Sequence, residues 1–430
     1  TTKDGTVMTG ETLTYGEYQI EEVKAPNGYL LATKPIKFTI SKNNPYQTLP
    51  DGKTPVITVI QKDTAVKGRI NIEKRGDVLV GYENGNFVYE ERGLKGMTAK
   101  VYAKENIMDP SNDGTILYKK GTLVDTITTG ENGKATTKKL PLGVYEVREV
   151  TAPNGLVINT KPQTVELKYK DQDTAIVYED ITFHNERQKV DASLMKVDED
   201  GTTGLSGAKF NLIAKEDIKN AVGEVIVKAN TVLKKYTSDA DGNIMIDLDL
   251  PLNTDFALKE VKAPVGYVLD QTEILFNTNY QGQDVQTIVI EKIKENERTK
   301  VSFSKTDATT GKELAGNHLT IFEKENPASI FTSWVSGEKP HVVENLSTDT
   351  RYVLRETSAV KGFYLATDIE FEIAKDGTVY TFDKDGNKVV AKDNLVKMEN
   401  NLVTGRLKWN KSGEIFTSTI SGQTEFGKTE

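Results

Sequence analysis

The chain has 430 residues, a formal net charge of -8 and no cysteine. Acidic and basic residues are interspersed along its whole length, which excludes the basic stripe of a nucleic-acid-binding groove, and no apolar run is long enough to span a membrane. The absence of cysteine excludes disulfides, thiolate metal sites and cysteine nucleophiles, and the three histidines are too scattered to predict a metal or cofactor site.

Residues 1–66 contain an alternating strand, Tyr18-Gln-Ile-Glu-Glu22, which runs into the turn Ala25-Pro-Asn-Gly28. Side chains alternate along a strand, so the aromatic residue, the aliphatic residue and Glu22 share one face of a sheet. A carboxylate on an otherwise apolar face requires a partner, because an unpaired buried charge is costly. We interpret residues 1–66 as the C-terminal half of a repeating unit that closes near Asp63.

Residues 67–188 form the first complete unit and carry three landmarks. An early strand ends in Lys74, a second copy of the Glu strand ends in Glu149, and a closing strand ends in Asn185. This unit is also the longest, because residues 80–89 form an insertion with three aromatic side chains among turn residues. If any unit binds another protein, this insertion is where the binding surface is expected.

The same three landmarks return twice more in the same order. Residues 189–298 contain Lys196, Glu260 and Asn296, and residues 299–403 contain Lys305, Glu356 and Asn400. Two details stay open at this point. The strand before Asn296 alternates poorly, so its register can slip, and Asn401 competes with Asn400, although alternation with Val396 and Met398 favours Asn400.

Residues 404–430 resemble the start of a further unit. Their strand, Arg406-Leu-Lys-Trp-Asn-Lys411, repeats the alternation that precedes Lys74, and Trp409 shares the face of Lys411. The stretch Gly422-Gln-Thr-Glu-Phe-Gly427-Lys428-Thr429 matches the phosphate-binding P-loop pattern. That motif works only between a strand and the N-terminus of a helix, and the surrounding pattern is one of strands, so no nucleotide partner is predicted.

The whole pattern predicts an all-β chain. Short alternating strands rich in Val, Ile, Thr and Tyr are separated by turn residues, and helical periodicity is nearly absent. Many short strands at regular spacing predict β-sandwiches in tandem. The expected division is 1–66, 67–188, 189–298, 299–403 and 404–430.

The Lys strand, the Glu strand with its Ala-Pro-x-Gly-Tyr turn and the closing Asn strand together resemble the Cna-B, or SpaA-type pilin, domain of Gram-positive cell-wall-anchored proteins. The resemblance covers essentially the whole chain. It implies prealbumin-like, immunoglobulin-type β-sandwiches and an extracellular place on a bacterial cell wall, with the anchor outside this chain. It also implies self-formed isopeptide bonds between lysine and asparagine.

Matching residue by residue assigns three bonds, each with a catalytic glutamate: Lys74–Asn185 with Glu149, Lys196–Asn296 with Glu260, and Lys305–Asn400 with Glu356. Burial lowers the pKa of a lysine and raises that of a glutamate, so a neutral amine can attack the amide carbon while the acid serves the leaving ammonia. Glu22 and Asp63 form an incomplete site whose lysine is expected upstream of this chain, and Lys411 is a lysine whose glutamate and asparagine are expected downstream of it.

The sequence therefore predicts a structural stalk or adhesin segment that is not an enzyme beyond its own cross-linking. The alternative is a host-binding module, in which one sandwich recognises an extracellular matrix protein or an immunoglobulin, with residues 80–89 as the expected contact. Neither hypothesis includes a nucleic acid, a nucleotide or an inserted membrane segment as a partner.

Overall fold

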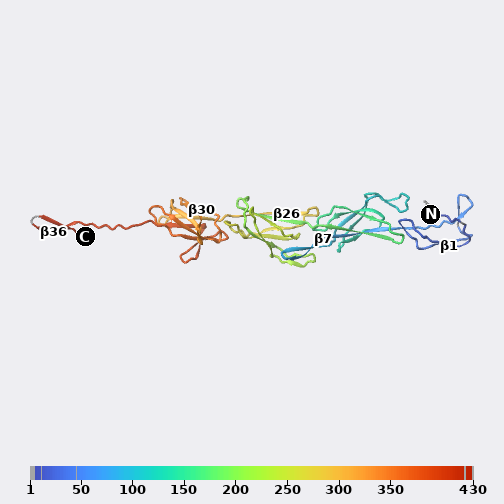
Figure 1. Cartoon of the computed structure of the whole chain (residues 1–430), viewed down its shortest axis with the longest axis horizontal. Helices are drawn as coiled ribbons and strands as arrows, with labels where there is room; N and C mark the ends of the chain where they lie inside the picture. The colour runs from blue at the N-terminus through green and yellow to red at the C-terminus, as the bar shows by residue number, and fades with distance from the viewer. Residues whose placement is uncertain (1–4, 11, 45, 421–422, 429–430) are drawn as a thin grey trace.

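The computed structural model describes residues 5–10, 12–44, 46–420 and 423–428. They form an elongated row of β-domains, with the N-terminal and C-terminal segments at opposite ends (Figure 1). Within these residues the regular elements are strands, apart from one short 3-10 turn, η1 (Lys392–Asn394), and no helix is long and apolar enough to cross a membrane. The predicted all-β class is confirmed.

Residues 67–188 fold as a sandwich of two sheets. One sheet has the order β12-β9-β15-β16, and the other is built around β7, which pairs with β13, β14, β8 and β17. Its strands are β7 (Lys67–Glu83), β8 (Asn86–Gly93), β9 (Thr98–Ala103), β12 (Leu123–Thr128), β13 (Lys134–Thr136), β14 (Leu140–Pro141), β15 (Gly143–Thr151), β16 (Gln163–Leu167) and β17 (Ile176–Asn185), with a small ribbon of β10 (Ile107–Met108) and β11 (Ile116–Tyr118). Inward residues of both sheets, including Ile70, Tyr145 and Phe183, form one core.

Residues 189–298 repeat this arrangement with sheets β23-β18-β26 and β22-β19-β24-β25. The strands are β18 (Lys189–Asp198), β19 (Lys209–Ala214), β20 (Ile218–Lys219), β21 (Val225–Val227), β22 (Val232–Thr237), β23 (Asn243–Ile246), β24 (Asp255–Lys262), β25 (Ile274–Asn277) and β26 (Thr287–Asn296). The core centres on Phe210, Leu212 and Phe256.

Residues 299–403 form a third sandwich, with sheets β30-β27-β35 and β29-β28-β31-β32-β33-β34. Its strands are β27 (Lys300–Asp307), β28 (His318–Glu323), β29 (Asn326–Val335), β30 (His341–Glu344), β31 (Arg351–Ser358), β32 (Ile369–Ile373), β33 (Val379–Phe382), β34 (Lys388–Val390) and β35 (Leu395–Asn400). Phe303, Tyr352 and Phe371 lie at the centre of the core.

In each complete sandwich the first and last strands are neighbours and run parallel. β7 pairs with β17, β18 with β26 and β27 with β35, each without a register shift. The asparagine always lies opposite the residue two positions after the lysine: Asn185 opposite Gly76, Asn296 opposite Asp198 and Asn400 opposite Asp307. The poorly alternating strand β26 therefore holds the same register as its counterparts.

The two ends of the row are less complete. In residues 5–66, β1 (Gly16–Ile20) pairs with β3 (Ile36–Ile40), β2 (Tyr29–Leu30) with β6 (Thr64–Ala65), and β4 (Gln47–Thr48) with β5 (Pro55–Val56). At the other end, residues 404–413 are exposed and have no regular structure, so the strand expected before Lys411 is not formed there. A hairpin of β36 (Glu414–Ile420) and β37 (Gln423–Lys428) follows.

The insertion at residues 80–89 is not a free binding loop, which corrects the surface expected from the sequence. β7 and β8 form a hairpin arm that turns at Asn84-Gly85, both with positive φ, and lies against the next domain (Figure 1, blue strand below the green and yellow strands). Phe87 is 6% exposed and belongs to the core of residues 189–298. Tyr82 and Tyr89 donate to the backbone carbonyls of Leu233 and Asp249.

Candidate functional site

Each candidate site is built from both sheets of its sandwich. The lysine and the asparagine come from the two parallel strands, and the glutamate comes from the facing sheet, on β15, β24 or β31. On β15 the alternation buries Tyr145, Val147 and Glu149 together. The carboxylate that looked out of place in the sequence therefore points across the core toward the first and last strands.

Lys74, Glu149 and Asn185 meet in the interior of residues 67–188. Asn185 Nδ2 donates to Glu149 Oε1 at 2.7 Å, and the Asn159 amide donates to Glu149 Oε2 at 3.0 Å. Lys74 Nζ donates to the carbonyl of Arg75 at 2.7 Å and to that of Phe183 at 3.5 Å. Asn185 Oδ1 is buried and accepts no hydrogen bond from the described residues.

Lys196, Glu260 and Asn296 form the second group with nearly the same contacts. Asn296 Nδ2 donates to Glu260 Oε1 at 3.0 Å and to Oε2 at 2.9 Å, and Lys196 Nζ donates to the carbonyls of Val197 and Lys294, both at 2.9 Å. All three side chains are buried. Asn296 Oδ1, like its counterpart in the first group, is buried and accepts no hydrogen bond from the described part of the chain.

In the third group the lysine already contacts the amide. Lys305 Nζ donates to Asn400 Oδ1 and lies 3.3 Å from Glu356 Oε1, while Asn400 Nδ2 donates to Glu356 Oε1 at 2.9 Å. Asn400 is buried, whereas the competing Asn401 is exposed. The alternation of β35 thus selects Asn400, as Val396 and Met398 indicated.

Burial shifts these groups toward their neutral forms. It lowers the pKa of Lys74 and of Lys196 to about 8 and also lowers that of Lys305. It raises the pKa of Glu149 and of Glu260. A neutral amine carries the lone pair that attacks a carbonyl carbon, and a protonated carboxyl can donate to the amide oxygen and pass its proton to the departing nitrogen.

Glu22 and Asp63 also lie together, in the N-terminal unit. The Ala32 amide donates to Glu22 Oε2 at 2.8 Å, a contact that Asn159, Asp270 and Ala366 make with the glutamates of the complete domains. Burial and the nearby Glu22 raise the pKa of Asp63, whose Oδ1 is buried and accepts no hydrogen bond from the described residues. The segment 404–413, which contains Lys411, lies at the opposite end of the row from this unit (Figure 1).

The turn after each Glu strand docks onto the next domain, a role that alternation alone did not reveal. The amides of Leu31, Ile158 and Leu269 donate to the backbone carbonyls of Gln172, Gln283 and Lys375, at 2.9, 2.9 and 2.8 Å. The Gln172 and Gln283 side chains also accept from the amides of Ala25 and Ala152, at the start of the Ala-Pro turn. The recurrence of that turn once in each of residues 1–66, 67–188 and 189–298 was the available signal.

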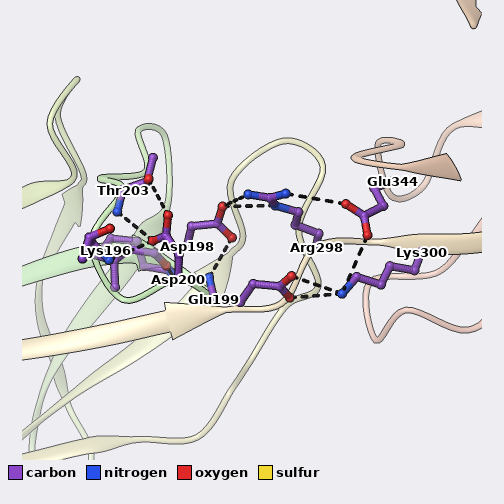
Figure 2. Close-up of polar contacts among 10 residues, drawn as sticks. Lys196, Asp198, Glu199, Asp200, Thr203, Arg298, Lys300 and Glu344 are labelled. Atoms are coloured by element: carbon purple, nitrogen blue, oxygen red, sulfur yellow. Dashed lines mark hydrogen bonds and ion pairs between the residues drawn. The ribbon is translucent and has the colours of Figure 1, made fainter. Parts of the chain in front are cut away.

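A charged network reinforces the third of these junctions, between residues 189–298 and 299–403 (Figure 2). Asp198, buried on the strand that carries Lys196, accepts from Arg298 Nε at 3.1 Å, and Arg298 Nη1 lies 3.5 Å from Glu344 of the next domain. Lys300 adds a contact to Glu199 at 3.1 Å. The hydrogen bond from Arg298 lowers the pKa of Asp198. The end of the lysine strand of one domain is therefore linked to β27 and β30 of the next.

The P-loop-like stretch is not a helix start. Gly422 and Thr429 lie outside the described residues, and Gln423–Lys428 form strand β37 of a hairpin. A P-loop needs backbone amides at a helix N-terminus to hold a phosphate. The described part of the motif therefore has the wrong local structure.

Comparison with known proteins places the fold in a family. The SpaA prealbumin-like fold domain matches residues 1–53, 88–182, 190–294 and 299–388. The prealbumin-like sandwiches expected from the sequence are thereby confirmed. No curated protein sequence matches the chain.

Several solved structures are similar at low identity. The Bacillus anthracis TIE protein is 22% identical with a TM-score of 0.47, and the alignment covers 79% of this chain and 52% of that one. The pilus adhesin SpaC of Lactobacillus rhamnosus GG, in its open conformation, is 15% identical with a TM-score of 0.30, covering 80% of this chain and 45% of that one. The shaft pilin SpaA of the same organism is 17% identical with a TM-score of 0.21, covering 54% of this chain and 98% of that one. The chain thus spans about half the length of the first two.

Proposed function

The chain belongs to the family of SpaA prealbumin-like fold domains, and from that premise we propose that it is a stalk segment of a bacterial surface protein, stiffened by intramolecular isopeptide bonds. The bonds join Lys74 to Asn185, Lys196 to Asn296 and Lys305 to Asn400. The chain acts on no external substrate, and its only chemistry is the closure of its own cross-links.

One observation carries this proposal. A lysine, a glutamate and an asparagine are buried together in each of the three complete domains, on equivalent strands. In each domain the asparagine pairs with the residue two positions after the lysine. Burying ionisable side chains without a role costs free energy, and three repetitions of the same cost point to a common purpose. Amide formation removes the charge of the lysine and gives that burial a reason.

The reaction balances without a cofactor. The neutral Nζ atom attacks Cγ of the asparagine, the Cγ–Nδ2 bond breaks, and Nδ2 leaves as ammonia. The glutamate accepts the hydrogen bond of Nδ2 in all three groups, so it stands beside the leaving nitrogen and can hand it a proton. Holding the groups in one dry site supplies the high effective concentration that amide formation requires.

The placement of the bonds suits a load-bearing rod. Tension enters each domain through its first strand and leaves through its last strand, and these strands are parallel neighbours. A bond between Lys305 and Asn400, 95 positions apart in sequence, carries the load past the rest of that domain. The strands between them are then not sheared when the ends of the row are pulled.

Intact mass spectrometry of the purified chain tests the proposal most directly. The measured mass is expected to be lower than the sequence mass by three ammonias, because each bond releases one. Peptide mapping should then recover the branched peptides that join each lysine to its asparagine. A mass equal to that of the sequence contradicts cross-linking in all three domains.

The rate of closure should depend on pH. The amines of Lys74 and Lys196 become neutral as pH rises through about 8, whereas Glu149 and Glu260 are needed in their protonated form. Formation of the isopeptide bonds is therefore expected to be slow in acid, where the amines are protonated. It should slow again above pH of about 8, where the lysines are already neutral and the remaining protonated glutamate is lost. Chain that is collected unfolded, before any bond has closed, is refolded at about pH 5 to 10, and the loss of ammonia is followed by mass. A rate that rises steadily with pH would show that the glutamates are not used as acids.

The alternative function was the capture of an extracellular matrix protein or an immunoglobulin through residues 80–89, and these residues are not available for it. The aromatic residues Tyr82, Phe87 and Tyr89 of the insertion pack on residues 189–298 and hold two domains together. No other described surface specifically favours such a partner, so host recognition is not proposed for this segment.

A further inference from the structure

We propose that strand β29 (Asn326–Val335) is an interaction surface at which two copies of the chain pair side by side around a two-fold axis. The two β29 strands run antiparallel and join the six-stranded sheets of residues 299–403 into one continuous sheet. The edge formed by β29 is open, apolar and uncharged, and the missing charge separates it from the equivalent edges of the other two complete domains.

The outer side of β29 is free. Within the described residues β29 pairs with β28 alone, and no backbone hydrogen bond joins it to any other segment. Asn326–Phe331 are exposed in succession, and Ile330, Phe331 and Val335 are 61%, 43% and 53% exposed. An edge of this kind presents unpaired N–H and C=O groups, together with apolar side chains, to a strand that can lie beside it.

The equivalent edge strands of the other two complete domains are shorter and charged. β12 and β22 have 6 residues each, whereas β29 has 10. Through its pairing with the neighbouring strand, Thr332 occupies the position of Asp125 in β12 and of Lys234 in β22. Asp125 accepts from the Lys138 amide at 2.8 Å, and Lys234 donates to Asp247 at 2.7 Å. Each of these charges therefore binds a later segment of its own domain, whereas Thr332 brings no charge to this position.

Charged side chains normally protect an edge strand from pairing with another chain, because a charge that loses its water beside a foreign strand is costly. The edge formed by β29 lacks this protection. Residues 326–337 are the longest stretch of the sequence without Asp, Glu, Lys or Arg. Pro327 blocks pairing only near the start of the strand, where it has no N–H to donate. The remainder of β29 is open to a regular ladder of hydrogen bonds.

Charge matching identifies the occupant as a second copy of β29. An uncharged apolar strand is best matched by another uncharged strand, because no ionised group then loses its water between them. The other long edge strands of the described chain all carry charged side chains: β12, β16, β17, β22, β26 and β35. β29 of a second copy is therefore the matching strand that the chain itself provides. Two identical strands meet around a two-fold axis in a closed, isologous contact.

The position of Pro327 sets the register of the pair. In an antiparallel pair around a two-fold axis perpendicular to the sheet, one residue lies opposite its own copy. A ladder over residues 329–335, which follow Pro327, has Thr332 at its centre. Thr332 then faces Thr332 of the second copy, a cross-strand pair that is favourable. The same register places the exposed Ile330 opposite Trp334 of the second copy, where it is covered.

Sedimentation of the full chain over a wide range of concentration tests the pairing. The mass should shift from that of one chain to that of two as the concentration rises, and the amides of β29 should then exchange more slowly while those of β12 do not change. A chain that stays monomeric at its highest soluble concentration overturns the proposal. If such a monomer binds a synthetic peptide of residues 326–337, the edge accepts a strand, but a second copy of the chain is the wrong occupant.

Two variants show whether β29 is the contact. Thr332→Lys and Thr332→Asp introduce the charges that Lys234 and Asp125 provide at the same position of the other domains, so the fold should tolerate them. Each variant alone should lose the dimer, because like charges then lie opposite one another, and their mixture should recover it. Thr126→Lys, at an exposed position of β12, is the matched control and should keep the dimer.

A dimer that survives in both Thr332 variants uses another surface and overturns the proposal. Loss of the dimer in both variants without recovery in the mixture contradicts the pairing of Thr332 with its own copy. Ammonia loss should be the same in all of these chains, because Thr332 and Thr126 are not among the cross-linking groups. The pairing and the isopeptide bonds are therefore tested independently.

Discussion

Replacing Glu260 by Ala is expected to leave residues 189–298 without their cross-link and to make them the least stable of the three complete domains. Glu260 is buried, accepts from Asn296 Nδ2 and faces Lys196 across the sandwich. Without it no group can serve the leaving ammonia. Loss of a link that closes a loop of about 100 residues costs about 4.7 kcal/mol in the free energy of unfolding by the chain-entropy estimate.

Mass and protease resistance measure this result together. The variant should be heavier than the parent by one ammonia, after correction for the substitution, and among the three complete domains proteases should cut residues 189–298 first. Glu260→Gln separates chemistry from packing, because it fills the same space but carries no transferable acid proton. Glu291→Ala, at an exposed position of β26, is the matched control and should keep all three bonds. Full ammonia loss in both Glu260 variants would contradict the role assigned to this glutamate.

Replacing Phe87 by Ala should destabilise residues 189–298, although Phe87 itself is part of residues 67–188. Phe87 lies on the arm of residues 67–188, but it is buried in the core of residues 189–298 and contacts Tyr82 with ring centroids 4.8 Å apart. Truncating a buried phenylalanine costs about 3–5 kcal/mol. The loss should therefore appear in the unfolding of residues 189–298, with no change in the number of ammonias released.

Hydrogen exchange locates that effect. The Ala221 amide donates to the Leu79 carbonyl of the arm, so its protection reports whether the arm is docked. Faster exchange is expected there and in β20 and β21, with little change in β9 and β15. Tyr178→Ala, at an exposed position of β17, is the control and should change neither region. Loss of protection confined to residues 67–188 would mean that the arm does not support its neighbour.

Much of the candidate site was predictable because alternation is a local property. A glutamate two positions after an aliphatic residue on a strand must share its face, and the recurrence of Glu149, Glu260 and Glu356 marked that face as special. The same rule chose Asn400 over Asn401. Alternation could not decide which face of the sheet Asn296 lies on, because apolar and polar residues alternate poorly along β26. The register of β26 is fixed instead by its parallel pairing with β18.

Contacts between domains were beyond that rule. The hairpin arm has aromatic residues on a turn-rich insertion, a pattern that fits a binding loop as well as a buried one. Only the position of the neighbouring core decides between them, and Phe87 fills it. Likewise, the Ala-Pro-x-Gly turn reads as the exit of a strand until the following domain brings the carbonyls of Gln172, Gln283 and Lys375 to it.

The sequence by itself determined the all-β class and the repeat, because both follow from period-two alternation and spacing. The resemblance to SpaA-type domains then selected the lysine, glutamate and asparagine of each candidate site from the recurring strands. The tertiary structure decided which groups are in contact, which are buried enough for their pKa to shift toward the neutral form, and which contacts join each domain to the next. Those properties depend on residues that lie far apart in sequence and are brought together by folding. Asp198 and Arg298, which are hydrogen-bonded at one junction, are an example.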